Sequence, residues 1–295
     1  GSPIMAGMIK PFKCNLHKNV LSAEFCGQHK DLFPAAYFDA APMAGLSIEL
    51  ARRLDSSLAM LPFDYVSEAE AYGAELIGFD DDFGLRAKGK HLNAVNELTA
   101  LPPMDFTRGR LAEIIKAVGL IKDAGYVPCL NITGYFALID ILLPIEKGFS
   151  AWRKRQPALL EFFAIYERDL LEYITLALNA GAQVISYSDP LTSLELLGIK
   201  NGQQIAAELI LPFFKKISCL ENNGVIHVCG ISSDILTAAD AAWQEIKLEQ
   251  EEYYSTAVVR QALQATEIKF LGRGCLHHKR KTNTIMQLLI EDIKE

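Results

Sequence analysis

The residues of this sequence most suggestive of chemistry are a histidine and a cysteine two positions apart. His227 lies near the end of the apolar run 224–228, and Cys229 comes directly after that run. Because a β-strand alternates its side chains with a period of two, both are expected to point to the same side. Imidazole and thiolate are preferred ligands of zinc, and three protein ligands with one open position are typical of a catalytic zinc site. The spacing alone favours a simpler interpretation, a core histidine beside a buried thiol.

A third candidate ligand, Cys275, follows a glycine-x-glycine step at the end of a later apolar run, 268–271. The ends of parallel barrel strands meet on one rim, so a cysteine distant in sequence can complete a metal site there. The remaining cysteines have no metal-type neighbours and are interpreted as structural: Cys14, Cys26, Cys129 and Cys219. Scattered cysteines in a chain of this size indicate reduced thiols and not a disulfide framework.

The elements that must position these residues alternate between short apolar runs and helical patterns. Strands are predicted at 57–63, 126–131, 183–187, 224–228 and 268–271, and helices at 108–124 and 157–180. Continuous apolar strands alternating with helices predict a parallel sheet covered on both faces. The periodicity leaves open whether that α/β sheet is doubly wound and open or closed into a barrel.

The length and composition limit the domain count and the partners. A chain of 295 residues suits one large α/β domain, so we interpret residues 1–7 as an expression scar and 8–295 as a single domain. The formal net charge is −7 and no basic patch is evident, which argues against a nucleic-acid partner. No apolar run reaches the roughly 20 residues that span a bilayer, and no secretory leader is seen. We therefore expect a cytoplasmic protein with no membrane partner.

Several segments together resemble a known family. The segment Ile226-His227-Val228-Cys229-Gly230, followed by Gly274-Cys275, resembles the His-x-Cys…Cys zinc signature of the corrinoid-dependent coenzyme M methyltransferases, within the uroporphyrinogen decarboxylase superfamily. Segments 68–75 (EAEAYGAE), 131–138 (NITGYFAL) and 180–190 (AGAQVISYSDP) resemble others of that superfamily in the same order. Segment 282–285 (TNTI) resembles the start of its last helix. The resemblance covers about residues 30 to 295.

The resemblance implies a TIM-type (β/α) barrel that moves a methyl group from a methylated corrinoid protein to a small thiol such as coenzyme M. It implies Zn²⁺ held by His227, Cys229 and Cys275, a catalytic and substrate-binding Asp189, and further substrate contacts from Asn131, Thr133 and Gly134. The residues alone allow other roles: Asp189 suits a turn before Pro190, and Asn131 or Thr133 suits a helix cap. His277 and His278 are expected to face solvent.

One departure from the family concerns the interval between the two cysteines, 46 positions, which is shorter than in the relatives. It leaves room for a strand at 243–249 and a helix at 253–265, so we predict a barrel shortened by about one βα unit. Two alternatives remain. A decarboxylase acting on a tetrapyrrole is disfavoured because the arginine-rich segment that grips its carboxylates is missing, with only Arg52-Arg53 in the N-terminal part. A non-catalytic zinc-binding barrel would be favoured by a fourth protein ligand.

Overall fold

The computed structural model describes residues 12, 21–78, 84–277 and 279–290, and every structural statement below refers to these residues. Three sequence interpretations lie outside them: the expression scar at 1–7, the structural role of Cys14 and the exposure of His278. None of the five described cysteines is in a disulfide.

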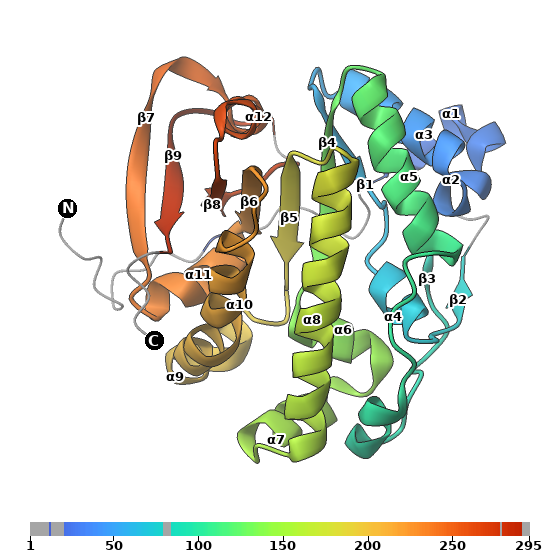
Figure 1. Cartoon of the computed structure of the whole chain (residues 1–295), viewed down its shortest axis with the longest axis vertical. Coiled ribbons are helices and arrows are strands. Elements are labelled where there is room, and N and C mark those ends of the chain that lie inside the picture. Colours follow the sequence, from blue (N-terminus) through green and yellow to red (C-terminus); the bar gives the residue numbers. More distant parts are fainter. Residues whose placement is uncertain (1–11, 13–20, 79–83, 278, 291–295) are drawn as a thin grey trace.

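A mixed seven-stranded sheet forms the centre of the molecule, in the order β1-β4-β5-β6-β8-β9-β7 (Figure 1). Its strands are β1 (Leu58–Leu61), β4 (Val127–Thr133), β5 (Val184–Ser188), β6 (Gly224–Cys229), β7 (Ala242–Tyr253), β8 (Ile268–Gly274) and β9 (Lys281–Leu289). The first five strands of that order are parallel, whereas β9 runs antiparallel to both β8 and β7. A separate antiparallel pair joins β2 (Leu76–Ile77) to β3 (Arg86–Ala87).

Helices follow or precede most of the parallel strands. They are α1 (Ala23–Gln28), α2 (Ala35–Phe38), α3 (Ala40–Arg53), α4 (Ser67–Ala71), α5 (Gly109–Asp123), α6 (Tyr135–Leu142), α7 (Ile145–Arg153), α8 (Pro157–Ala180), α9 (Leu194–Ile205), α10 (Leu211–Ser218), α11 (Gly230–Ala238) and α12 (Tyr254–Gln264). Short 3₁₀ or π turns occupy Lys30–Leu32, Val95–Ala100 and Ala206–Ile210. In Figure 1 the helices α1 to α3 lie at one end of the molecule and the strands β7 and β9 at the other.

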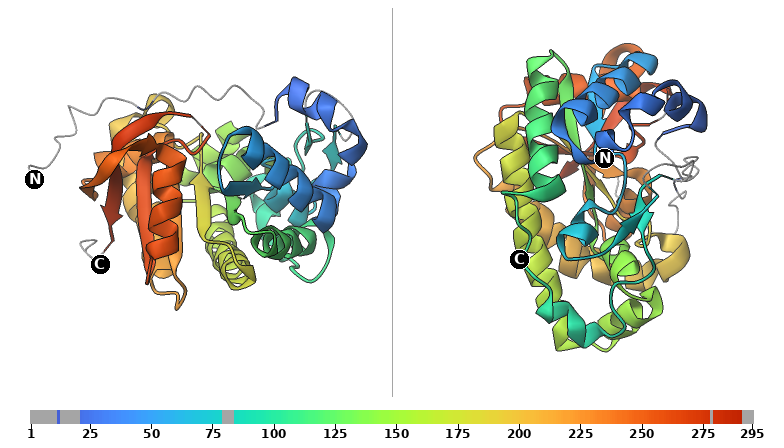
Figure 2. Two further views of the ribbon diagram at one scale, coloured as in Figure 1. Left: turned by 90° about the horizontal axis from the view of Figure 1, so that it is seen from above. Right: turned by 90° about the vertical axis from the view of Figure 1, so that its right-hand side faces the viewer.

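The two faces of the sheet bury different sets of alternating side chains. One set, which includes Leu130, Ile185 and Ile226, belongs to the larger core with α3, α5, α8 and α10. Figure 2 shows α5 and α8 side by side along that face. The other set, which includes Val184 and Val225, packs against α12. Because the strands are covered on both faces, they read in the sequence as continuous apolar runs.

Helix α12 covers the sheet face that a barrel would enclose. Its residues pack against β1 at one end of the sheet and against β7 and β9 at the other. The apolar side of the helix, with Ala257, Val258 and Ala262, joins the core formed by that face. The helix therefore fills space that the interior side chains of further strands would fill in a complete barrel.

The predicted strands and helices agree with the structure to within a few residues, and the α/β class with a mostly parallel sheet is confirmed. A closed barrel is not formed: in the part of the chain that the structure describes, no pairing joins β1 to β7. The likeness of segment 282–285 to the start of a helix is wrong, because these residues lie in β9. Thr282, Thr284 and Ile285 are β-branched, and β9 gains ladder partners on both sides.

No helix among the described residues is both long and apolar enough to cross a membrane.

Candidate functional site

A cavity of about 430 Å³ lies at the carboxyl ends of β4, β5, β6 and β8. This volume is in the range typical of small-molecule sites. Its polar lining residues are Tyr65, Asn131, Thr133, Ser186, Ser188, His227, Cys229, Cys275 and His277. No aspartate, glutamate, lysine or arginine of the described chain lines it. The cavity therefore offers imidazole, thiol, amide and hydroxyl groups, and no fixed charge.

The polar lining arises from the register of three parallel strands. Asn131 pairs with Ser186, and Ser186 pairs with His227, so these three side chains form a row across one face. The next row on the same face holds Thr133 opposite Ser188, and Cys229 follows His227 by two positions. The sequence prediction that His227 and Cys229 share one side of a strand end agrees with their place in one cavity wall.

A bulge in β8 positions Cys275 beside this wall. Val228 pairs with Gly272 while Cys229 pairs with Gly274, so β8 carries one extra residue, Arg273, at φ 60°. A Cβ atom on Gly274 would lie 2.2 Å from Cζ of Tyr254, so only glycine allows the tyrosine ring this close to the strand end. Cys275 comes next and lines the cavity.

The ring of His227 is buried and is held at one nitrogen only. Its Nε2 lies 2.9 Å from the hydroxyl of Tyr254, which in turn donates to the carbonyl oxygen of Gly272 at 3.2 Å. With the phenol proton donated to this carbonyl, which can only accept, the tyrosine oxygen accepts from Nε2–H and the lone pair of the neutral ring is assigned to Nδ1. Nδ1 is buried and has no hydrogen-bond partner among the described residues. Burial, with a smaller contribution from His277, lowers the pKa of His227 to about 3.

The donor set partly meets the requirements of a zinc site. His227, Cys229 and Cys275 line one cavity, and Nδ1 of His227 is a buried donor atom without a partner. As placed, however, no three histidine, cysteine, aspartate or glutamate side chains of the described chain lie close enough together to hold a metal ion. Ion binding would therefore require the three side chains to come closer together. The residue types and their location fit the ion, and their present placement does not converge on it.

Asp189 and Gly134 lie behind the cavity wall and do not line it. The carboxylate of Asp189 accepts the backbone N–H of Phe136 at 2.9 Å and that of Ala137 at 3.0 Å, at the start of α6. Burial raises the pKa of Asp189 to about 7. A Cβ atom on Gly134 would lie 2.3 Å from Cβ of Asp189, so glycine is required for this close approach. In the structure these two residues fix the start of α6 against the end of β5.

Asn131 and Thr133 both line the cavity and are anchored from outside it. Asn131 donates from Nδ2 to the carbonyl oxygen of Pro62 at 3.0 Å. The hydroxyl of Thr133 donates to the carboxylate of Glu68 at 3.1 Å, and its backbone N–H does so at 3.0 Å. Burial raises the pKa of Glu68. Both side chains are thus held in place before any ligand enters.

Sequence reasoning missed four residues of the site: Ser186, Ser188, Tyr254 and His277. The two serines had a signal, because their period-two spacing in an apolar strand marks the polar face. Tyr254 had none, since its position depends on where α12 packs. His277 was expected to face solvent, and the structure places it in the cavity wall because the chain turns there after β8.

The fold and the position of the cavity define an α/β protein whose site lies at the carboxyl ends of parallel strands. The family model of uroporphyrinogen decarboxylase (URO-D) matches residues 22–263. The chain therefore belongs to this family, and the resemblance seen in its motifs is confirmed. The matched range includes His227 and Cys229 and ends before Cys275.

Two curated relatives are methyltransferases. The chain is 26% identical over 222 residues to a methylcobamide:CoM methyltransferase MtbA of Methanosarcina mazei, a match that covers 70% of this chain and 62% of the relative. It is 23% identical over 229 residues to a methylcobamide:CoM methyltransferase MtaA of Methanosarcina barkeri, covering 74% of this chain and 65% of that one. The matches thus span less than two thirds of the length of these relatives.

A solved structure of a methyltransferase from Methanosarcina mazei superimposes with a TM-score of 0.61 at 21% sequence identity. The match covers 74% of this chain and 66% of that chain. At this identity the likeness supports the shared fold.

Proposed function

We propose that this chain is a zinc-dependent methyltransferase that moves a methyl group from a methylated corrinoid to a small thiol. One observation carries the proposal: His227, Cys229 and Cys275 line a single cavity at the carboxyl ends of the strands. The relatives named methylcobamide:CoM methyltransferases support the same reaction class. A corrinoid protein is the proposed methyl donor, and coenzyme M or a similar thiol is the proposed acceptor.

The reaction requires a thiolate at neutral pH, where a free thiol with a pKa near 8.5 is mostly protonated. Zinc bound by one imidazole and two cysteinates would supply that thiolate by lowering the pKa of the incoming thiol. The sulfur lone pair forms the new C–S bond as the C–Co bond breaks. The electron pair of the broken bond stays on the corrinoid, and the thiol proton has already left to solvent.

The residues of the chain would prepare this step. Tyr254 holds the Nε2–H of His227, so the lone pair stays on Nδ1. Asn131 and Ser186 present an amide and a hydroxyl beside His227, where they can orient a polar acceptor. No lysine or arginine of the described chain lines the cavity wall. A positively charged side chain there would stabilise the thiolate further and weaken it as a nucleophile.

The same lining disfavours the decarboxylase alternative and leaves the structural-zinc alternative to be tested. A tetrapyrrole with many carboxylates would want several convergent arginines, and no described arginine or lysine lines this cavity. A closed structural zinc site needs a fourth protein ligand. His277 is a further imidazole in the wall, so the ligand set of the bound metal decides between a structural and a catalytic site.

The test is methyl transfer by the whole chain. Zinc-loaded protein is mixed with methylcobalamin and 2-mercaptoethanesulfonate, and loss of the methyl–cobalt absorbance is followed together with the S-methyl product. We expect turnover that disappears with a chelator and in Cys229→Ser or Cys275→Ser. Cys219→Ser is the matched control, because Cys219 is exposed and precedes β6. Turnover that persists in both ligand variants would contradict the proposal.

A further inference from the structure

A buried carboxylate lies directly behind the cavity wall of the candidate site. Glu68 of α4 is only 1% exposed, and its carboxylate accepts three hydrogen bonds. Thr133 donates from its backbone N–H at 3.0 Å and from its hydroxyl at 3.1 Å, and the hydroxyl of Ser67 donates at 3.1 Å. No cation of the described chain pairs with Glu68. A buried carboxylate without a counter-ion is costly, and the fold alone does not require one here.

The charged and titratable groups around Glu68 leave its charge uncompensated. Arg110 of α5 pairs with Asp64 and Glu70 instead. The phenols facing Glu68 are neutral, because burial raises the pKa of each, and they belong to Tyr72, Tyr166 and Tyr173. Burial also raises the pKa of Glu68, whereas its hydrogen bonds act in the opposite direction. These opposing effects suit a carboxyl group that changes its protonation state near neutral pH.

A row of hydroxyl groups joins this carboxylate to the candidate zinc ligands. Thr133 of β4 pairs with Ser188 of β5. Ser188 in turn lies beside Cys229, because the parallel pairing of β5 and β6 runs as far as the residues just before them. All three side chains line the cavity. The row therefore runs from a candidate ligand, across two hydroxyl groups, to Glu68.

We propose that Glu68 takes up the proton of the acceptor thiol through the hydroxyls of Ser188 and Thr133. The inference rests on the proposed function, in which the thiol loses its proton as its sulfur binds zinc, and it replaces direct loss of that proton to solvent. The S–H bond breaks, its electron pair stays on sulfur, and its proton moves to the oxygen of Ser188. The hydroxyl proton of Ser188 moves to Thr133, and that of Thr133 moves to Oε2 of Glu68.

This transfer keeps the net charge of the site constant. Zinc with one imidazole and two cysteinates is neutral, so a bound thiolate makes the zinc site negative. If Glu68 stayed ionised, two negative charges would share a region of low dielectric and repel one another. Protonation of Glu68 removes that repulsion and so favours the thiolate at zinc.

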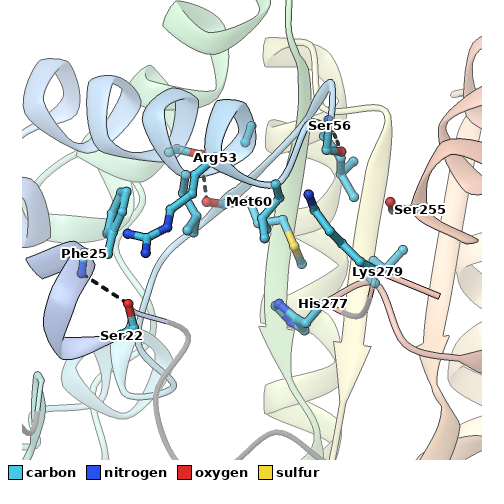
Figure 3. A pocket seen from close by; sticks show the side chains of 14 residues that line it. Ser22, Phe25, Arg53, Ser56, Met60, Ser255, His277 and Lys279 are labelled. Atoms are coloured by element: carbon cyan, nitrogen blue, oxygen red, sulfur yellow. Dashed lines mark hydrogen bonds between the residues drawn. The ribbon is translucent and has the colours of Figure 1, made fainter. Parts of the chain in front are cut away.

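A second group able to accept the proton is the imidazole of His277, which also lines the cavity. His277 lies where this cavity adjoins another, of about 200 Å³, beside β1. Figure 3 shows His277 and Lys279 there, with Met60 between them and Arg53. His277 follows β8, whereas Glu68 lies behind β4, so variants of the two residues distinguish the two acceptors.

The experiment counts the protons released when 2-mercaptoethanesulfonate binds the whole zinc-loaded chain. Calorimetry at about pH 7 is run in PIPES and in Tris buffer, which differ in ionisation enthalpy, so the difference in binding heat gives the protons passed to the buffer. Glu68→Gln, Ser188→Ala and Thr133→Val interrupt the row, and Thr133→Ser restores its hydroxyl. His277→Gln tests the competing acceptor. Glu75→Gln is the matched control, because Glu75 is exposed and follows α4.

We expect the wild type, Thr133→Ser and Glu75→Gln to release well below one proton per bound thiol, because Glu68 keeps it. The three interrupting variants should release about one, because a thiol with a pKa near 8.5 is mostly protonated at pH 7. Infrared difference spectra of the wild type should show the C=O stretch of a newly protonated carboxyl group when the thiol binds. That band should be absent in Glu68→Gln.

Three results would overturn the inference. The first is release of about one proton by the wild type, which decides the matter even if Glu68→Gln fails to fold. The second is retention of the proton that survives in Glu68→Gln. The third is retention lost in His277→Gln and kept in Glu68→Gln, which assigns the proton to His277.

The outcomes separate this inference from the proposed function. If the thiol sulfur ligates zinc and methyl transfer proceeds while the wild type passes its proton to the buffer, the inference fails and the proposed function stands. If X-ray absorption shows that the thiol never ligates zinc, the proposed function fails and this route for the proton fails with it.

Discussion

The hydroxyl of Tyr254 lies 2.9 Å from Nε2 of His227 and ties the first residue of α12 to the middle of β6. The same hydroxyl donates to the carbonyl of Gly272 in β8. One side chain therefore joins the helix that fills the open sheet to both strands that carry the candidate ligands. Because it determines which ring nitrogen of His227 keeps its lone pair, Tyr254 would act as a positioning residue for the proposed zinc ion.

Replacing Tyr254 by phenylalanine should weaken zinc binding about 10- to 100-fold, the usual effect of removing a partner of a metal ligand. Competition against a chelator of known affinity measures it, with Tyr253→Phe as the control. Nitrogen NMR of the imidazole in the zinc-free protein should show Nε2 protonated in the wild type and a mixture of tautomers in Tyr254→Phe. Unchanged zinc binding would show that the hydroxyl does not position the ligand, and tighter binding would show that it competes with the ion for the imidazole.

Gly134→Ala should destabilise the fold by about 1–3 kcal/mol, because its Cβ would lie 2.3 Å from Cβ of Asp189 and the start of α6 would have to shift. Gly45→Ala is the matched control. Its Cβ would meet no atom within 4 Å in α3, so it should stabilise by about 0.5–1 kcal/mol. Urea unfolding of both variants checks the pair, and equal effects would show that the contact between Gly134 and Asp189 is not tight.

Asp189 should give a pH dependence of stability opposite to that of most carboxylates. Its folded pKa of about 7 lies above the ordinary value of 3.8, so the folded state binds the proton more tightly than the unfolded state. The contribution of the protonated Asp189 to the free energy of unfolding is greatest below about pH 4. It is lost as the pH rises to 7, at roughly 1.4 kcal/mol per pH unit.

Comparing the wild type with Asp189→Asn isolates the pH-dependent contribution of Asp189 to the free energy of unfolding. The wild type should lose unfolding free energy relative to the variant as the pH rises from 4 to 7. Asp123→Asn, an exposed carboxylate on α5, is the control and should track the wild type. A constant difference between wild type and Asp189→Asn across this range would show that Asp189 stays ionised in the folded protein.

The sequence was sufficient for the strands and for the shared face of the candidate ligands. Period-two spacing fixes the relation of His227 to Cys229 whatever the rest of the chain does. The short interval before Cys275 predicted a barrel shortened by about one βα unit, and the described residues form a seven-stranded sheet that does not close. These features depend on local pattern and on chain length. The family resemblance was also correct, because it rested on several ordered motifs.

The sequence did not predict the features that depend on packing between residues far apart in the chain. Segment 282–285 looked like the start of a helix, but it pairs with β7, and the residues that follow it in the same strand pair with β8 as well. Strand pairing with distant parts of the chain prevails over the local likeness. The place of α12 across the open face, and with it the contact between Tyr254 and His227, depends on a sheet that does not close. Asp189 reads as a pocket residue by motif, whereas its carboxylate caps α6.

X-ray absorption at the zinc edge, recorded on the whole chain before and after addition of 2-mercaptoethanesulfonate, tests the central claim most directly. Ligation by His227, Cys229 and Cys275 predicts two sulfur ligands at about 2.3 Å in the resting protein and three with the thiol present. Cys275→Ser should lower each count by one. A resting site with two sulfurs and two imidazoles that gains no sulfur from the thiol would contradict the account and indicate a structural zinc closed by His277.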